Sequence, residues 1–154
     1  MADQHEVTVL SAQPSYGAGG DRQPGRQRVD GVEVRRLPAP RRGQSAALVS
    51  MVAFPAVVGA RLATLRGVDV VMCSTVPPVT LGFVVSALCR LQGRRFIYHC
   101  MDLHPEIGAL SGEFAHPLVY RALRALDTAT MRRADAIVVL SADMKQSVVH
   151  RDPA

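Results

Sequence analysis

The chain contains 154 residues, of which 48% are hydrophobic and 20% are charged. This length is sufficient for one domain with a sizeable core, and the hydrophobic content excludes an intrinsically disordered polypeptide. The net charge of +5 comes almost entirely from arginine, whose planar fork binds two oxygens at once, and it predicts contact with nucleic acid, an anionic lipid surface or a phosphorylated substrate.

The N-terminal part is predicted to contain two strands separated by a loop. Alternating apolar residues indicate the first strand within His5–Ala12. Residues 14–30 are rich in Gly, Pro, Gln and Arg, and we interpret them as a flexible loop ending in the turn Asp30-Gly31. The GAGG run in this loop is not followed by Lys-Ser/Thr, which argues against a phosphate-binding loop. The second strand is expected at Val32–Leu37.

A basic cluster precedes the most hydrophobic segment of the chain. The cluster consists of Arg35, Arg36, Arg41 and Arg42, and the segment is Gln44–Arg66. This segment is too short and too interrupted for a transmembrane span, which needs about 20 apolar residues. A helix that is apolar nearly all round either is buried or lies in a bilayer interface, and both interpretations remain open. The four arginines are the candidate membrane-facing residues.

The remainder of the chain alternates strands with helices. The expected elements are a strand at Val68–Cys73, a helix at Val79–Leu91 closed by Gly93, a strand at Arg94–Cys100, a helix beginning at Pro117, a strand at Ala134–Leu140, and a helix at Ala142–His150 capped by Ser141. Near-continuous apolar strands are typical of parallel sheets buried on both faces. The pattern therefore predicts an α/β fold, a Rossmann-like open parallel sheet with helices on both faces and right-handed crossovers.

Candidate functional residues gather in the segment RRFIYHCMDLHPE, Arg94–Glu106. Its strand ends in a turn that contains Asp102, His104 and Glu106, and Pro105 disfavours a helical conformation at His104. Ligands of open α/β sheets bind beyond the carboxyl ends of the strands. The segment is therefore the candidate site, although a loop whose polar groups cap the next helix or face water is the simpler interpretation.

The cysteines and the N-terminus indicate a cytoplasmic protein. Cys73, Cys89 and Cys100 show no paired spacing and lie in apolar segments, which predicts buried thiols in a reducing compartment. The first residues lack the charged leader and apolar core of a signal peptide. A metal site built from His99, Cys100, Asp102 and His104 is a weak alternative, because neighbouring strand residues point to opposite faces.

A nucleic-acid-binding module is a second alternative, suggested by the excess of arginine. Phe and Tyr are few, and they are not interleaved with the arginines as base-stacking platforms would be. We therefore expect no nucleic-acid partner.

Five segments, taken in order, resemble one known family. They are HEVTVLSAQPSY, RVDGVEVRRLP, VDVVMCSTVPP, FIYHCMDLHPE and RRADAIVVLSADM. Together they resemble the N-terminal domain of family 4 glycosyltransferases of the GT-B fold, in particular the subgroup that builds bacterial surface polysaccharides on lipid carriers. The resemblance implies one of two Rossmann-like domains that face each other across a cleft. The other domain holds a nucleotide-sugar, and no metal is required because basic side chains and helix N-termini stabilise the leaving diphosphate.

The resemblance also implies roles for individual residues. Asp102 stands where the family places an acidic or His residue beside the acceptor, so it is the candidate catalytic base or acceptor-orienting group. Glu106 is expected to support the turn or to cap the next helix, and His104 stands where relatives commonly carry an aromatic residue. The expected acceptor-side, cleft-lining residues are His99, His104, Glu106, Ser74 and Ser141.

Two parts of the family pattern are not found in this sequence. The family domain begins with a strand, a Gly-rich turn and a helix before the segment that corresponds to HEVTVL, and a donor-binding domain follows the part that corresponds to residue 154. We therefore expect a partial acceptor-side domain with an exposed sheet edge, inactive alone and binding no cofactor. Its expected partners are the C-terminal donor-binding domain, a lipid-linked or saccharide acceptor, and peripherally the inner face of the cytoplasmic membrane. A non-catalytic docking half of a split or decayed protein is the alternative.

Overall fold

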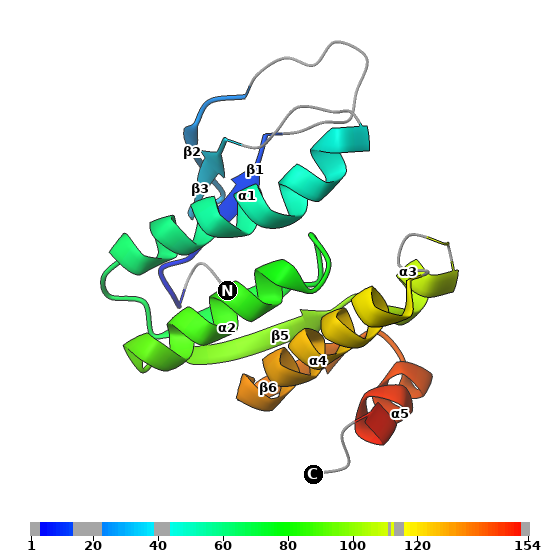
Figure 1. The fold of residues 1–154 in the computed structure, drawn as a ribbon. Coiled ribbons are helices and arrows are strands. Elements are labelled where there is room, and N and C mark those ends of the chain that lie inside the picture. Colours follow the sequence, from blue (N-terminus) through cyan, green and yellow to red (C-terminus); the bar gives the residue numbers. More distant parts are fainter. Residues whose placement is uncertain (1–3, 14–22, 39–43, 111, 113–115, 152–154) are drawn as a thin grey trace. The chain divides into compact units, whose positions relative to one another are not determined.

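The computed structural model describes residues 4–13, 23–38, 44–110, 112 and 116–151 as a mixed α/β protein (Figure 1). The chain divides into two compact units, residues 1–58 and residues 59–154. Its elements are β1 (Thr8–Ala12), β2 (Arg26–Val29), β3 (Val32–Leu37), α1 (Gln44–Thr64), β4 (Val70–Ser74), α2 (Thr80–Gln92), β5 (Arg95–Cys100), α3 (Glu106–Leu110), α4 (Pro117–Arg133), β6 (Ala136–Val139) and α5 (Ala142–Arg151).

The first unit contains a three-stranded sheet in the order β1-β3-β2. β1 is parallel to β3, whereas β2 pairs antiparallel with β3 through a hairpin at Asp30-Gly31. Both turn residues have positive φ angles, 47° and 82°, which is the geometry that matches the twist of a two-residue hairpin. The prediction of a loop over residues 14–30 is therefore wrong for Arg26–Val29, because the Asp-Gly turn folds this segment back onto β3. Residues 14–22 lie outside the described part of the chain.

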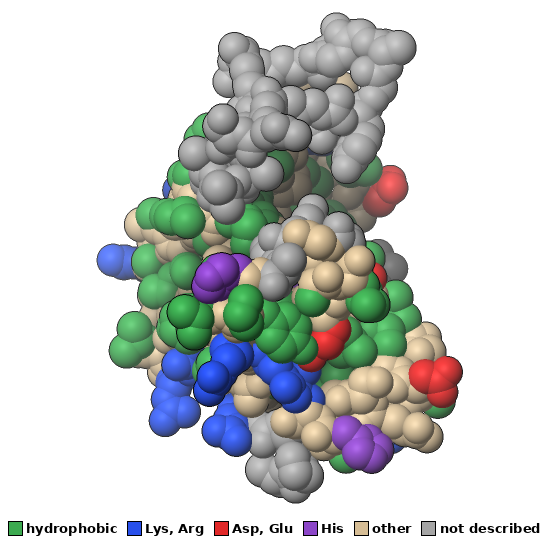
Figure 2. Space-filling view, turned by 45° about the vertical axis from the view of Figure 1, so that its right-hand side comes forward, with side chains coloured by type: hydrophobic (Ala, Val, Ile, Leu, Met, Phe, Trp, Pro, Cys, Tyr) green, Lys and Arg blue, Asp and Glu red, His purple; other side chains and the backbone are tan. Residues whose placement is uncertain are grey.

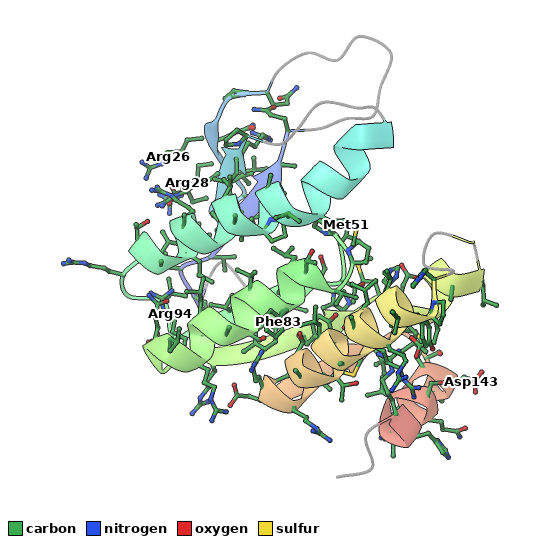
Figure 3. All side chains as sticks on the ribbon, viewed as in Figure 1. Arg26, Arg28, Met51, Phe83, Arg94 and Asp143 are labelled. Carbon is green, nitrogen blue, oxygen red and sulfur yellow. The ribbon has the colours of Figure 1, made fainter. Side chains whose placement is uncertain are left out.

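Ionic contacts on one face of this sheet join β2 to β3. The Glu33 carboxylate accepts two hydrogen bonds of 2.9 Å from Arg35 and forms an ion pair with Arg26. Cross-strand pairing places Arg28 on the same face, and Figure 3 shows Arg26 and Arg28 projecting together from β2. Two arginines therefore contact the Glu33 carboxylate, and a third lies on the same face.

Acid titration provides a test of this ionic face. The hydrogen bonds from Arg35 lower the pKa of Glu33 from 4.5 to about 2. Because this pKa is depressed, the contact stabilises the fold above pH 4.5, and the stabilisation is lost as the pH falls towards 2. We expect the carboxyl carbon of Glu33, followed by NMR, to titrate with a midpoint near 2. In the Arg35→Gln variant the midpoint should move towards 4.5. A wild-type midpoint already at 4.5 would contradict the ionic contact.

The second unit contains a parallel sheet in the order β4-β5-β6. On one face, Phe96, Tyr98 and Cys100 of β5 are buried, and α2 and α4 lie side by side across the sheet (Figure 1). Gly82 allows α2 to approach β5 and α4 closely, since a Cβ atom there would lie 2.9 Å from the Tyr98 ring and 3.1 Å from Thr130. On the opposite face, Met72 remains 56% exposed. The core of this unit therefore lies between the sheet and the α2–α4 layer.

The helix boundaries of the second unit follow local signals in the sequence. Gly93 ends α2 with φ 65°, the left-handed conformation that glycine adopts readily. Pro117 is the first residue of α4, and the Ser141 hydroxyl accepts a hydrogen bond of 3.2 Å from the Met144 N–H at the start of α5. These three predictions are confirmed. Among the described residues, no helix is both long enough and apolar enough to cross a membrane.

The described strands form two sheets of three strands, and the second is the parallel, Rossmann-like sheet that the sequence predicts. β1 lies at one edge of the first sheet and β4 at one edge of the second, and no strand ladder in the described residues joins them. The Rossmann-like pattern of parallel strands with intervening helices holds within the second unit, where α2 connects β4 to β5, and α3 and α4 connect β5 to β6.

Candidate functional site

The carboxyl ends of β4, β5 and β6 meet at one edge of the second sheet. The register places Ser74 beside His99, and His99 beside Val138. Because side chains alternate along a strand, Ser74 and His99 point to the same face, opposite to the buried Tyr98. Beneath this edge the buried Thr75 hydroxyl accepts a hydrogen bond of 3.3 Å from the Met101 N–H, which links the ends of β4 and β5.

The predicted turn follows β5 directly. Asp102 is exposed, and its backbone carbonyl accepts a hydrogen bond of 3.3 Å from the Cys100 thiol. His104 is half-buried, and its Nδ1 atom is buried without a hydrogen-bond partner among the described residues. Glu106 begins the short helix α3. The structure thus presents the Asp102 carboxylate to solvent and holds the residues that follow it against the protein.

Four side chains form an ionic cluster below this turn, which we call the Arg151 cluster: Tyr98, Glu106, Asp127 and Arg151. The Arg151 guanidinium bonds to the carboxylates of both Asp127 and Glu106, and it donates a hydrogen bond of 3.1 Å to the His104 carbonyl. The Tyr98 hydroxyl donates a hydrogen bond of 2.7 Å to the other oxygen of Asp127. Arg151 and Asp127 are almost completely buried, with side chains 4% and 2% exposed.

Burial dominates the electrostatics of the Arg151 cluster. Burial raises the pKa of Asp127. The Tyr98 hydroxyl and the Arg151 guanidinium favour the carboxylate and so act in the opposite direction, but their effect is smaller. Burial, together with the adjacent Asp127 carboxylate, also raises the pKa of Tyr98, so this hydroxyl stays protonated and remains a donor. The cluster therefore has the properties of a fixed structural support rather than of a proton-transfer site.

Sequence reasoning identified Glu106 but missed Asp127 and Arg151. Asp127 follows Leu123 by four residues and precedes Met131 by four, so its position on the buried stripe of α4 was a usable signal. An acidic residue on an apolar stripe requires a buried partner. Nothing local identifies that partner as Arg151.

The three cysteines are buried, as predicted. Burial raises the pKa of Cys73 to about 12 and that of Cys100 to about 11, and it also raises the pKa of Cys89. A pKa of about 11 in place of 9 lowers the thiolate fraction at neutral pH about a hundredfold. No group of three or more His, Cys, Asp or Glu in the described residues could hold a metal ion, and Cys100 and His99 lie on opposite faces of β5.

Thiol labelling tests this burial. With an excess of a disulfide reagent at neutral pH, we expect the native chain to react slowly at all three cysteines, because thiolate formation and access are both suppressed. In denaturant the same chain should react at once, which serves as the internal control. A native thiol that reacts as fast as one in the denatured chain would show that its segment is not packed as described.

The other predicted site residues lie outside this turn. The hydroxyl of the exposed Ser141 caps α5. In the first unit, Arg35 is paired with Glu33, whereas Arg36 donates hydrogen bonds to the Pro24 carbonyl and the Gln27 side chain. Arg35 and Arg36 project to opposite faces of β3, so they do not form one patch. Arg41 and Arg42 lie outside the described residues.

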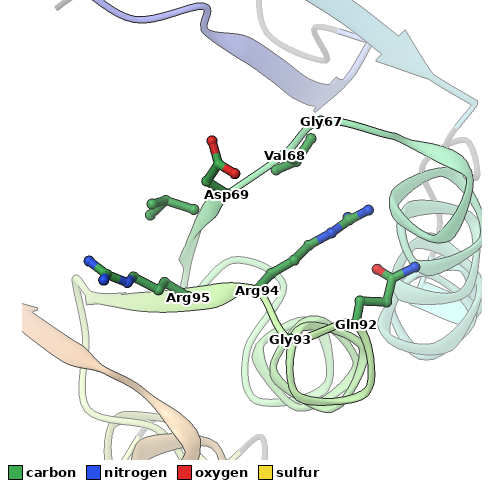
Figure 4. A pocket seen from close by; sticks show the side chains of 8 residues that line it. Gly67, Val68, Asp69, Gln92, Gly93, Arg94 and Arg95 are labelled. Carbon is green, nitrogen blue, oxygen red and sulfur yellow. The ribbon is translucent and has the colours of Figure 1, made fainter.

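An open pocket of about 530 Å³ lies at the amino ends of β4 and β5, away from the Asp102 turn (Figure 4). It is lined by Gly67–Val70 and Gln92–Arg95. The Arg94 guanidinium at this pocket donates hydrogen bonds to the carbonyls of Leu62 and Leu65, and Gln92 donates one to Ala63. These two side chains of the pocket are therefore engaged in holding the end of α1. For this reason the carboxyl edge of the sheet is the better candidate site.

Comparison with known proteins places the chain in a family. A model of the family described as glycosyl transferase 4-like domain matches residues 1–153. No curated protein and no solved structure matches the chain significantly.

Proposed function

The chain belongs to the glycosyl transferase 4-like domain family, and from this premise we propose that it is the acceptor-side domain of a sugar-transferring enzyme. The observation that carries the proposal is that the exposed Asp102 follows the carboxyl end of β5, three residues after His99, which pairs with Ser74 at the end of β4. This is where open α/β sheets bind ligands. The proposed acceptor is lipid-linked or a polysaccharide, as in the synthesis of bacterial surface polysaccharides.

In the proposed reaction, an acceptor hydroxyl attacks the anomeric carbon of a hexosyl or N-acetylhexosaminyl nucleotide-sugar. The new glycosidic bond forms as the bond to the nucleoside diphosphate breaks. The Asp102 carboxylate accepts the hydroxyl proton or orients the hydroxyl for attack. A partner donor-binding domain holds the nucleotide-sugar, and basic groups and helix N-termini there stabilise the departing diphosphate without a metal. Transfer therefore requires that second domain.

Exposed side chains near the turn support peripheral contact with the inner face of the cytoplasmic membrane, where a lipid-linked acceptor would lie. Leu110 of α3 and Leu118 of α4 are 89% and 68% exposed, and Arg121 and Arg124 are exposed on α4. Basic and hydrophobic side chains occur next to one another on the face seen in Figure 2. Apolar groups flanked by arginines suit an anionic bilayer surface.

The test is an NMR titration of the isotopically labelled chain with a short-chain polyprenyl-diphosphate-linked sugar and, separately, with a nucleotide-sugar. We expect the lipid-linked sugar to shift amide signals at Ser74, His99 and Asp102, and the nucleotide-sugar to leave them unchanged. The Asp102→Ala variant should weaken binding, whereas Asp69→Ala, at the opposite edge of the sheet, should not. Shifts confined to Gly67–Val70 and Gln92–Arg95, or shifts induced only by the nucleotide-sugar, would overturn the proposal.

A further inference from the structure

We infer that Arg151 is a positioning residue, which holds the Asp102 turn in place from the last turn of α5. Its connection to acceptor binding rests on the proposed function, whereas its effect on the turn does not. The described contacts of Arg151 are to His104, Glu106 and Asp127, so it would act on Asp102 through the backbone and side chains of the turn.

The contacts of Arg151 join segments that are distant in the sequence. Its Nη1 atom donates to the His104 carbonyl, 47 residues away, and also contacts the Asp127 carboxylate, 24 residues away. Its Nη2 atom donates to the Glu106 carboxylate, 45 residues away. His104 and Glu106 follow Asp102 by two and four residues. One side chain therefore fixes both a backbone carbonyl and a carboxylate just after the candidate catalytic group.

The other end of this connection is anchored in the core. Asp127 accepts a hydrogen bond of 2.7 Å from Tyr98, whose side chain is fully buried on the central strand β5. The connection runs from β5 through Tyr98, Asp127 and Arg151 to the turn that follows the same strand. The turn is therefore held at two points: by its covalent connection to the end of β5 and by its contacts with Arg151.

The chemistry of the contact explains why an arginine stands here. One planar guanidinium presents several N–H groups in fixed directions, which lets Arg151 serve two carboxylates and a carbonyl together. A lysine ammonium is a compact point charge on a flexible stem and cannot reproduce this arrangement. The Arg124 Nε atom lies 3.9 Å from the other Glu106 oxygen, and the Arg124 side chain is half-exposed. Arg124 therefore adds a positive charge near Glu106 but, unlike Arg151, is not buried.

The experiment measures hydrogen exchange of backbone amides in the full chain. We expect Glu106→Gln and Arg151→Lys to speed exchange about tenfold within residues 101–110, because each weakens a charge-assisted hydrogen bond to the turn. Exchange in β5 and α2 should stay unchanged. Arg124→Met serves as the matched control and should have little effect, since its contact is long and half-exposed. Glu106→Gln leaves the contact between Arg151 and Asp127 in place, and Arg151→Lys keeps a positive charge beside Asp127.

A titration of the same variants with the lipid-linked sugar separates positioning from stability. In Glu106→Gln and Arg151→Lys, acceptor affinity should fall while the thermal melt of the core stays close to that of the wild type. Unchanged exchange within residues 101–110 in both variants would overturn the inference, even if the wild type binds acceptor. Faster exchange in a chain whose wild type binds no acceptor would support the positioning role and refute the proposed function.

Discussion

Replacement of Asp127 by Ala is expected to lower the free energy of unfolding by about 3–5 kcal/mol, the range observed when one partner of a buried ion pair is removed. Asp127 is 1% exposed and bonds to both Tyr98 and Arg151. Its loss would leave the buried Arg151 guanidinium with only the Glu106 carboxylate and the His104 carbonyl as partners, and the Tyr98 hydroxyl without its acceptor. Chemical denaturation followed by circular dichroism measures the change.

Two comparisons isolate the ion pair from the loss of packing volume. Asp127→Asn keeps the shape and one acceptor oxygen for Tyr98, so its cost should come mainly from the missing charge opposite Arg151. Asp143→Ala, on the exposed first turn of α5, should change the free energy of unfolding little, since nothing there is buried. Equal stabilities of wild type and Asp127→Ala would show that the Arg151 cluster does not form.

Replacement of Gly82 by Val is expected to lower the free energy of unfolding by about 1–3 kcal/mol, the usual cost of overpacking a core. A Cβ at this position would lie 2.9 Å from the Tyr98 ring. The ring cannot move away easily, because its hydroxyl is bonded to Asp127 and the ring stacks with Phe96 at a centroid distance of 6.0 Å. The measurement is again chemical denaturation.

Gly59 offers a matched comparison on α1. A Cβ there would meet Val84 and Leu88 at 2.9 and 3.3 Å, but these side chains are half-buried and can move outwards. Replacement of either helical glycine by Ala gains intrinsic helix stability of about 1 kcal/mol. Gly59→Ala should therefore be better tolerated than Gly82→Ala. If Gly82→Ala were instead the more stable variant, the Tyr98 ring would not be fixed as the hydrogen bond to Asp127 requires.

Much of the candidate site could be predicted from the sequence because its residues are consecutive. Asp102, His104 and Glu106 follow one apolar strand, and the end of a parallel strand is a binding edge wherever the sheet is placed. The register of Ser74 with His99 follows from pairing two neighbouring parallel strands. The separation of Arg35 from Arg36 could also be expected from the sequence, because a strand directs neighbouring side chains to opposite faces.

The sequence by itself determined the order of β4, α2, β5, α4, β6 and α5 in the second unit and several of the helix boundaries, but not the short helix α3. Apolar periodicity and the signals at Gly93, Pro117 and Ser141 act within a few residues, so they do not depend on the rest of the fold. Only the tertiary structure decided that β2 pairs back onto β3, that the strands form two sheets, and that Arg151 meets Asp127 and Glu106. These contacts join residues up to 47 positions apart, and their geometry depends on how α3, α4 and α5 pack around β5.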